Sequence, residues 1–134
     1  MSRTLVAYAG TAVVFAALDA VWLTATNASL YRPALGPLLA DTVRPVPAVL
    51  FYAIYLAGVV LFAVTPGLRS GQWLTATLLG AALGFVAYAT YDLTNQATLK
   101  LWATRITLLD LGWGTFVTAA GASAGFWTVR LARL

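Results

Sequence analysis

Three carboxyl groups lie in stretches of sequence that are otherwise almost entirely apolar. The chain has four acidic residues, all of them Asp, and Asp19, Asp92 and Asp110 fall inside long apolar runs. Placing an ionisable side chain in a bilayer costs roughly 2.5–3.5 kcal/mol on insertion scales, so such residues mark functional sites by default. Buried carboxyl groups can hold protons, bind cations or act as general acids and bases.

The most polar stretch is residues 91–102, YDLTNQATLKLW, at the end of one apolar run. Asp92 and Asn95 are three residues apart and therefore share a helix face, which Tyr88 extends by one turn. We predict a polar site for protons or a ligand here. The candidate residues from this region are Tyr88, Tyr91, Asp92, Thr94, Asn95 and Lys100.

A second pattern repeats near the other two carboxyl groups. Asp19-Ala-Val-Trp22 and Asp110-Leu-Gly-Trp113 are both D-x-x-W, which places a carboxylate and an indole on one helix face. The two helices run in opposite directions, so the motifs are expected to face one another across one site. An indole that only donates to a carboxylate, with no ligand involved, remains an equally good interpretation.

The composition excludes a soluble globular domain. Of the 134 residues, 61% are hydrophobic and 9% are charged, whereas a soluble domain carries roughly 25% charged residues. Cys and His are absent, which removes disulfides, thiol chemistry and the usual zinc and haem ligands. We therefore expect no metal and no cofactor. The net charge of +4 fits anionic lipids better than nucleic acid, because no basic run is present.

Four apolar stretches are long enough to cross a bilayer, which takes about 20 residues. The predicted spans are about 4–28, 47–65, 73–97 and 106–129, with an interfacial loop, or a lid over the site, at about 29–46. The sequence thus predicts one all-α domain over 1–134, a polytopic membrane protein with a four-transmembrane-helix antiparallel bundle. Alternating chain direction brings all three buried Asp residues toward the face that carries Lys100 and the long loop.

Two pairs of glycines predict close helix packing. Gly80 and Gly84 on the third span, and Gly121 and Gly125 on the fourth, have the small-xxx-small spacing that lets helix backbones approach. The packing is expected within one bundle, or between copies in a homodimer or larger oligomer. Basic residues divide four against four between the two faces, so the sequence encodes no orientation.

Three motifs carry a family resemblance: LDAVWL, AYATYDLTNQATLKLW and LLDLGWG. They resemble an uncharacterised family of small bacterial inner-membrane proteins, a domain of unknown function with four predicted spans, over nearly the whole chain. The resemblance implies that architecture, the inner membrane as location and no established activity. Positions matching the family pattern are Asp19, Trp22, Tyr91, Asp92, Thr94, Asn95, Lys100, Asp110, Trp113 and the packing residue Gly114.

Three functions fit these residues. The first is movement of protons or of a small cationic or polar solute, since three carboxylates face one nearby ammonium and need a held proton, a loop arginine or a bound cation. The second is a membrane-embedded isomerase, cyclase or hydratase acting on a lipid or isoprenoid. The third is a non-catalytic, lipid-binding subunit. Membrane lipids are expected partners and nucleic acid is not. Polar groups that merely fix helix register would need no ligand.

Overall fold

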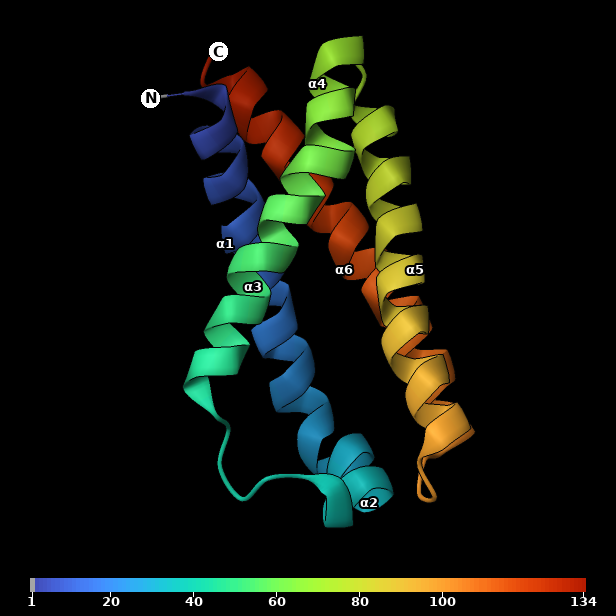
Figure 1. The fold of residues 1–134 in the computed structure, drawn as a ribbon. Helices are drawn as coiled ribbons and strands as arrows, with labels where there is room; N and C mark the ends of the chain where they lie inside the picture. The colour runs from blue at the N-terminus through green and yellow to red at the C-terminus, as the bar shows by residue number, and fades with distance from the viewer. Residues whose placement is uncertain (1) are drawn as a thin grey trace.

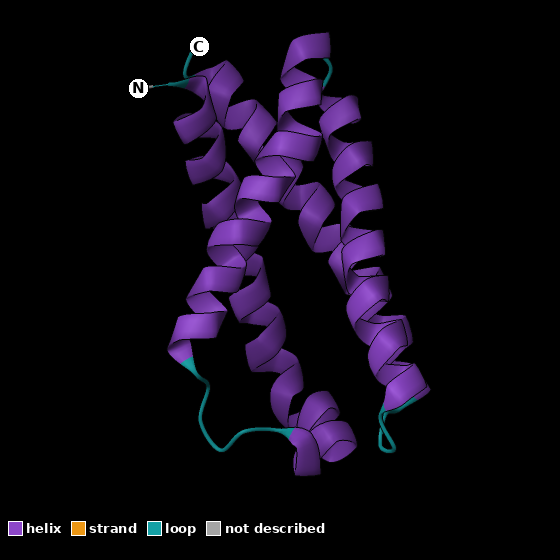
Figure 2. Ribbon diagram, viewed as in Figure 1, coloured by secondary structure: helices purple, strands orange, loops and turns teal. Residues whose placement is uncertain are grey.

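Every secondary-structure element is helical in the computed structural model, which describes residues 2–134 (Figure 2). The long helices are α1 (Arg3–Thr26), α3 (Pro45–Val59), α5 (Trp73–Thr98) and α6 (Thr104–Leu131). They alternate in direction, and both termini lie at the same end of the bundle (Figure 1). The expected all-α antiparallel arrangement is therefore present.

Three helical stretches are long and apolar enough to cross a membrane: Arg3–Leu38, Pro45–Ser70 and Trp73–Thr98. Helix α6 does not meet the same standard of composition, although it has 28 residues. The less apolar composition of α6 follows from its position, since it packs along both α1 and α5. Eleven of its residues are buried, against four in α5. Its many Gly, Ala, Ser and Thr residues face other helices, where small side chains are favoured.

The expected loop at 29–46 is largely helical. Helix α1 continues through a π-helical turn, η1 (Asn27–Tyr31), then α2 (Arg32–Leu35) and a 3-10 turn, η2 (Gly36–Leu38). Prolines at 33 and 37 suggested a loop, but each occupies a first-turn position of a short helix. A missing N–H is harmless at such a position. The prediction of a loop was wrong for most of this segment.

The second helical stretch also runs past its expected end near residue 65. A π-helical turn, η3 (Val60–Val64), connects α3 to α4 (Thr65–Ser70). Pro66 lies in the first turn of α4, where it needs no hydrogen-bond acceptor. In Figure 1, α4 lies beside the start of α5, whereas the start of α3 stands away from α5. The π turn is thus the point at which this helix changes direction.

The closest packing is in the half of the bundle that holds the termini. Its core combines residues from α1, the end of α3, η3 and α6: Ala7, Val59, Val60, Ala63, Val64, Ala122 and Val129. Gly125 of α6 approaches Thr11 and the backbone oxygen of Ala7 so closely that a methyl group would collide with them. The cavity in this half, about 170 Å³ beside Ala7 and Val60, is smaller than the one in the other half.

Glycines also set the distance between α5 and α6. A Cβ on Gly80 would come within 2.7 Å of the Ala122 Cβ and 3.0 Å of the Thr118 carbonyl oxygen. A Cβ on Gly84 would come within 2.7 Å of the Thr118 Cβ. Gly121 faces α1 instead, where the nearest atoms, on Phe15 and Thr11, would be 3.5 Å from an added Cβ, an ordinary contact. Gly80 and Gly84 therefore permit a close approach of α5 to α6, whereas no such close approach depends on Gly121.

Candidate functional site

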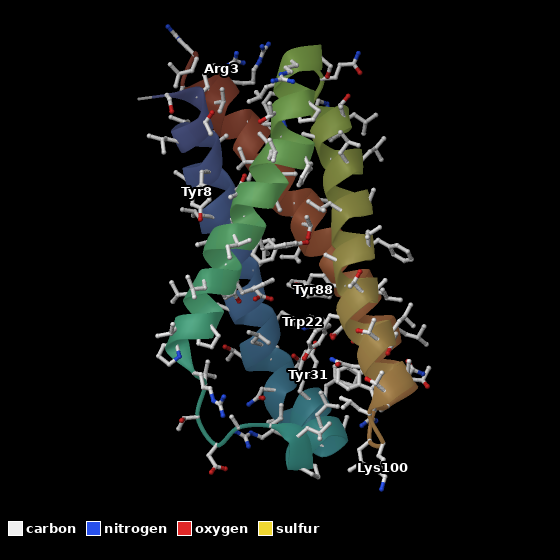
Figure 3. All side chains as sticks on the ribbon, in the orientation of Figure 1. Arg3, Tyr8, Trp22, Tyr31, Tyr88 and Lys100 are labelled. Atoms are coloured by element: carbon white, nitrogen blue, oxygen red, sulfur yellow. The ribbon has the colours of Figure 1, made fainter. Side chains whose placement is uncertain are left out.

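A cavity of about 380 Å³ lies between α1, α3, α5 and α6, in the half of the bundle away from the termini. Figure 3 shows Trp22, Tyr31 and Tyr88 in this half. The wall is mostly aromatic, with two carboxyl groups. Its residues are Asp19, Trp22, Leu23, Tyr31, Phe51, Tyr55, Ala87, Tyr88, Tyr91, Asp110 and Trp113.

Asp19 on α1 accepts hydrogen bonds from two other helices. The Tyr52 hydroxyl of α3 donates to Oδ2, and the Trp113 Nε1–H of α6 donates to Oδ1 at 3.2 Å. Both donors are uncharged, and Asp19 itself is buried. A carboxyl group in this position joins three helices at the cavity wall.

Asp110 on α6 has a matching environment. The Tyr31 hydroxyl donates to Oδ1 of Asp110, and the Trp22 Nε1–H donates to the Tyr31 hydroxyl oxygen at 2.9 Å. Tyr31 is the last residue of η1. The π turn at the end of α1 is what directs its side chain back toward α6.

The two D-x-x-W motifs cross over between α1 and α6. Trp113 donates to Asp19, while Trp22 reaches Asp110 through Tyr31. The two indoles stack, with ring centroids 4.6 Å apart and planes 7° from parallel. The motifs therefore meet face to face, as their spacing and opposite direction predict.

Asp92 on α5 is the most deeply buried of the three carboxyl groups, with 0% of its surface exposed. Neither of its side-chain oxygens has a hydrogen-bond donor among residues 2–134. The carboxyl group of Asp110 lies near enough to interact with it electrostatically. Two carboxyl groups this close cannot both be charged at little cost, so the pair is suited to sharing one proton.

The remaining predicted residues divide into two groups. Tyr88 and Tyr91 line the cavity, and the ring of Tyr88 lies against the backbone at Gly114, where any side chain would collide with it. Thr94 is exposed and donates back to its own helix, to the backbone oxygen of Tyr91 at 3.1 Å. Asn95 is half-buried outside the cavity wall.

Lys100 is exposed and lies beyond the end of α5, at the far end of the bundle (Figure 3). The expected approach of its ammonium group to Asp92 does not occur. Six residues of α5 follow Asp92 before the helix ends at Thr98, roughly 9 Å along the axis, and Lys100 lies beyond that end. The link between α5 and α6 is held instead by Gln96, whose Oε1 accepts from Thr107 at 2.7 Å.

Four aromatic residues of the site were not predicted from the sequence: Tyr31, Phe51, Tyr55 and, behind the wall, Tyr52. The spacing of residues 51, 52 and 55 places three aromatic rings on adjoining faces of a helix that is otherwise aliphatic. A buried tyrosine hydroxyl needs a hydrogen-bond partner, and a carboxyl group in the same half of the bundle is a strong acceptor. That signal could have identified Tyr52, whereas Tyr31 depends on the unforeseen π turn.

No three acidic residues within the described part of the chain are grouped so that they could hold a metal ion. The carboxyl groups of Asp19 and Asp110 instead face tyrosine and tryptophan donors and the open cavity. Chemically, the arrangement can store a proton, or accept a positively charged group from the cavity.

A family model described as "Predicted membrane protein (DUF2177)" matches residues 4–127. No curated protein and no solved structure matches the chain.

Proposed function

The chain belongs to this family of predicted membrane proteins, which confirms the resemblance carried by its motifs, and we propose that it exchanges protons for a small cation across the bacterial inner membrane. The observation that carries the proposal is the environment of Asp92. Both of its oxygens are buried without a donor, beside a second carboxyl group that opens onto a cavity.

The exchange follows from charge balance. In the empty site, Asp92 and Asp110 share a proton, because two adjacent charges in an apolar setting repel strongly. A cation in the cavity would neutralise Asp110 and allow that proton to leave. No Lys or Arg lines the cavity, so no resident positive charge competes with the entering cation.

In this proposal α6 is the fourth membrane span. Its 28 residues extend about 42 Å at 1.5 Å per residue, more than the roughly 30 Å of a hydrocarbon core. Arg105 and Arg130 lie near its two ends, where long side chains reach the headgroups. The central position of α6, with its small residues against α1 and α5, lets it tolerate a composition that lipid contact would penalise.

Proteoliposomes with a trapped pH dye test the exchange. Addition of sodium, potassium or tetraethylammonium chloride to acid-loaded vesicles is expected to drive proton efflux for at least one cation. Asp92→Asn should abolish that efflux, because the amide can neither release the shared proton nor carry the charge. Thr94→Val, two residues away on the same helix but exposed, is the matched control.

Efflux that is unchanged by Asp92→Asn would remove the carboxyl pair from the mechanism. Absence of efflux with all three cations would overturn the proposal of exchange itself.

A second function, an enzyme acting on a lipid or isoprenoid, is favoured by one observation. Phe51 and Tyr91 line the cavity yet are 48% and 61% exposed on the outer surface. A lipid could therefore enter from the side, between α3 and α5. A changed membrane lipid profile on deletion of the gene, with no cation flux in vesicles, would support the enzyme over the carrier.

A further inference from the structure

The cavity wall has a composition that selects among cations. Seven of its eleven residues are aromatic and two are carboxyl groups. A bare inorganic cation prefers a shell of oxygen ligands on all sides, whereas most of this wall is formed by aromatic side chains. Aromatic faces beside carboxylates are instead the surroundings that bind ammonium groups with apolar substituents.

Three hydrogen-bond donors at the wall are already engaged. The Trp113 indole donates to Asp19, the Tyr31 hydroxyl donates to Asp110, and the Trp22 indole donates to Tyr31. Besides the hydroxyls of Tyr88 and Tyr91, the cavity presents ring faces and carboxylate oxygens, which attract positive charge. An anionic headgroup such as a phosphate would meet two carboxyl groups and no basic side chain.

The opening of the cavity indicates how a ligand arrives. Phe51 on α3 and Tyr91 on α5 line the cavity and are also exposed on the surface of the bundle, which lipid would surround. A strongly hydrated ion cannot take that route, whereas an ammonium with apolar groups partitions into a bilayer. The volume of about 380 Å³ is within the range of small-molecule sites.

We propose that the ligand is an amphipathic organic ammonium, with a tertiary or quaternary nitrogen, that enters from the bilayer between α3 and α5. Its positive charge lies between the carboxyl groups of Asp19 and Asp110, and its apolar substituents contact the stacked indoles of Trp22 and Trp113. This inference rests on the proposed exchange function and specifies its substrate class.

Isothermal titration of the full-length protein in a neutral detergent tests the ligand class with defined probes. Tetraethylammonium chloride should bind saturably, whereas potassium chloride and dodecyl phosphate should give no saturable heat. Asp110→Asn and Tyr91→Leu should each weaken tetraethylammonium binding at least tenfold. The first removes the charge and the second removes one aromatic face. Lys100→Gln, which lies outside the cavity, should bind as the unaltered protein does.

Tyr91 is mostly exposed, so its substitution tests the aromatic wall without endangering the fold; an unchanged circular dichroism melt verifies this. Saturable binding of dodecyl phosphate, or of the uncharged 3,3-diethylpentane as tightly as tetraethylammonium, would overturn the proposal and indicate a lipid site. Binding without proton efflux would retain the ligand class and refute the exchange. Efflux driven by potassium without tetraethylammonium binding would support the exchange and refute the organic ammonium as its ligand.

Discussion

Replacement of Asp92 by Leu should leave the fold as stable as before or make it more stable. An unpartnered buried polar group costs about 1–3 kcal/mol, and neither oxygen of Asp92 has a donor. A proton shared with Asp110 returns about 1 kcal/mol. Leu keeps the branched shape and removes both the cost of the unpartnered polar group and the contribution of the shared proton. The expected gain in the free energy of unfolding is therefore about 0–2 kcal/mol.

The matched variant is Asp110→Leu, for which the opposite sign is expected. Asp110 accepts the hydrogen bond of Tyr31, and its loss leaves a half-buried phenol without an acceptor. That should destabilise the protein by about 1–3 kcal/mol. The effects of replacing two neighbouring carboxyl groups would then differ in sign, which separates a residue kept for chemistry from one that also holds helices together.

Both values can be measured by unfolding in mixed micelles with increasing sodium dodecyl sulfate, followed by the fluorescence of the five tryptophans. Asp92→Val controls for overpacking by the larger Leu side chain. If Asp92→Leu and Asp92→Val both lose more than about 1 kcal/mol, Asp92 has a stabilising partner and the account of its environment is refuted.

Three other predictions concern packing and the limits of the site. Gly84→Ala should destabilise the protein by about 1–3 kcal/mol through overpacking between α5 and α6, whereas Gly121→Ala, with ordinary contact distances, should stay within about 0.5 kcal/mol in the same unfolding assay. Tyr52→Phe removes one donor from Asp19 and should cost about 1 kcal/mol, again by unfolding; no change would show that this contact is not stabilising. Lys100→Gln should leave vesicle proton efflux unaltered, and a loss would place its ammonium group in the pathway.

The sequence predicts the elements of this fold well because they follow from hydrophobic length. Runs of about 20 apolar residues locate the helices, and chain direction alone places the three buried carboxyl groups in one half of the bundle. The D-x-x-W repeat correctly predicts that α1 and α6 bring Trp22 and Trp113 together. These inferences need only helix geometry.

Other features depend on irregular turns, which leave no periodic signal. Tyr31 reaches Asp110 because η1 alters the helix after residue 26, and the prolines nearby indicate a loop instead. Pro66 suggested a helix end, but η3 places it in a new first turn. Lys100 was grouped with Asp92 by closeness in sequence, whereas the straight course of α5 keeps them apart.

The π turn η3 carries one residue more than an α-helical turn, since the Thr65 N–H bonds to the Val60 oxygen, five residues back. Deletion of a single residue there would restore regular helix and rotate everything before it by about 100° relative to α4. Phe51, Tyr52 and Tyr55 would then turn away from the cavity together. The one extra residue in η3 therefore determines which side chains of α3 face the cavity. A one-residue deletion there would change the cavity wall without altering any side chain that forms it.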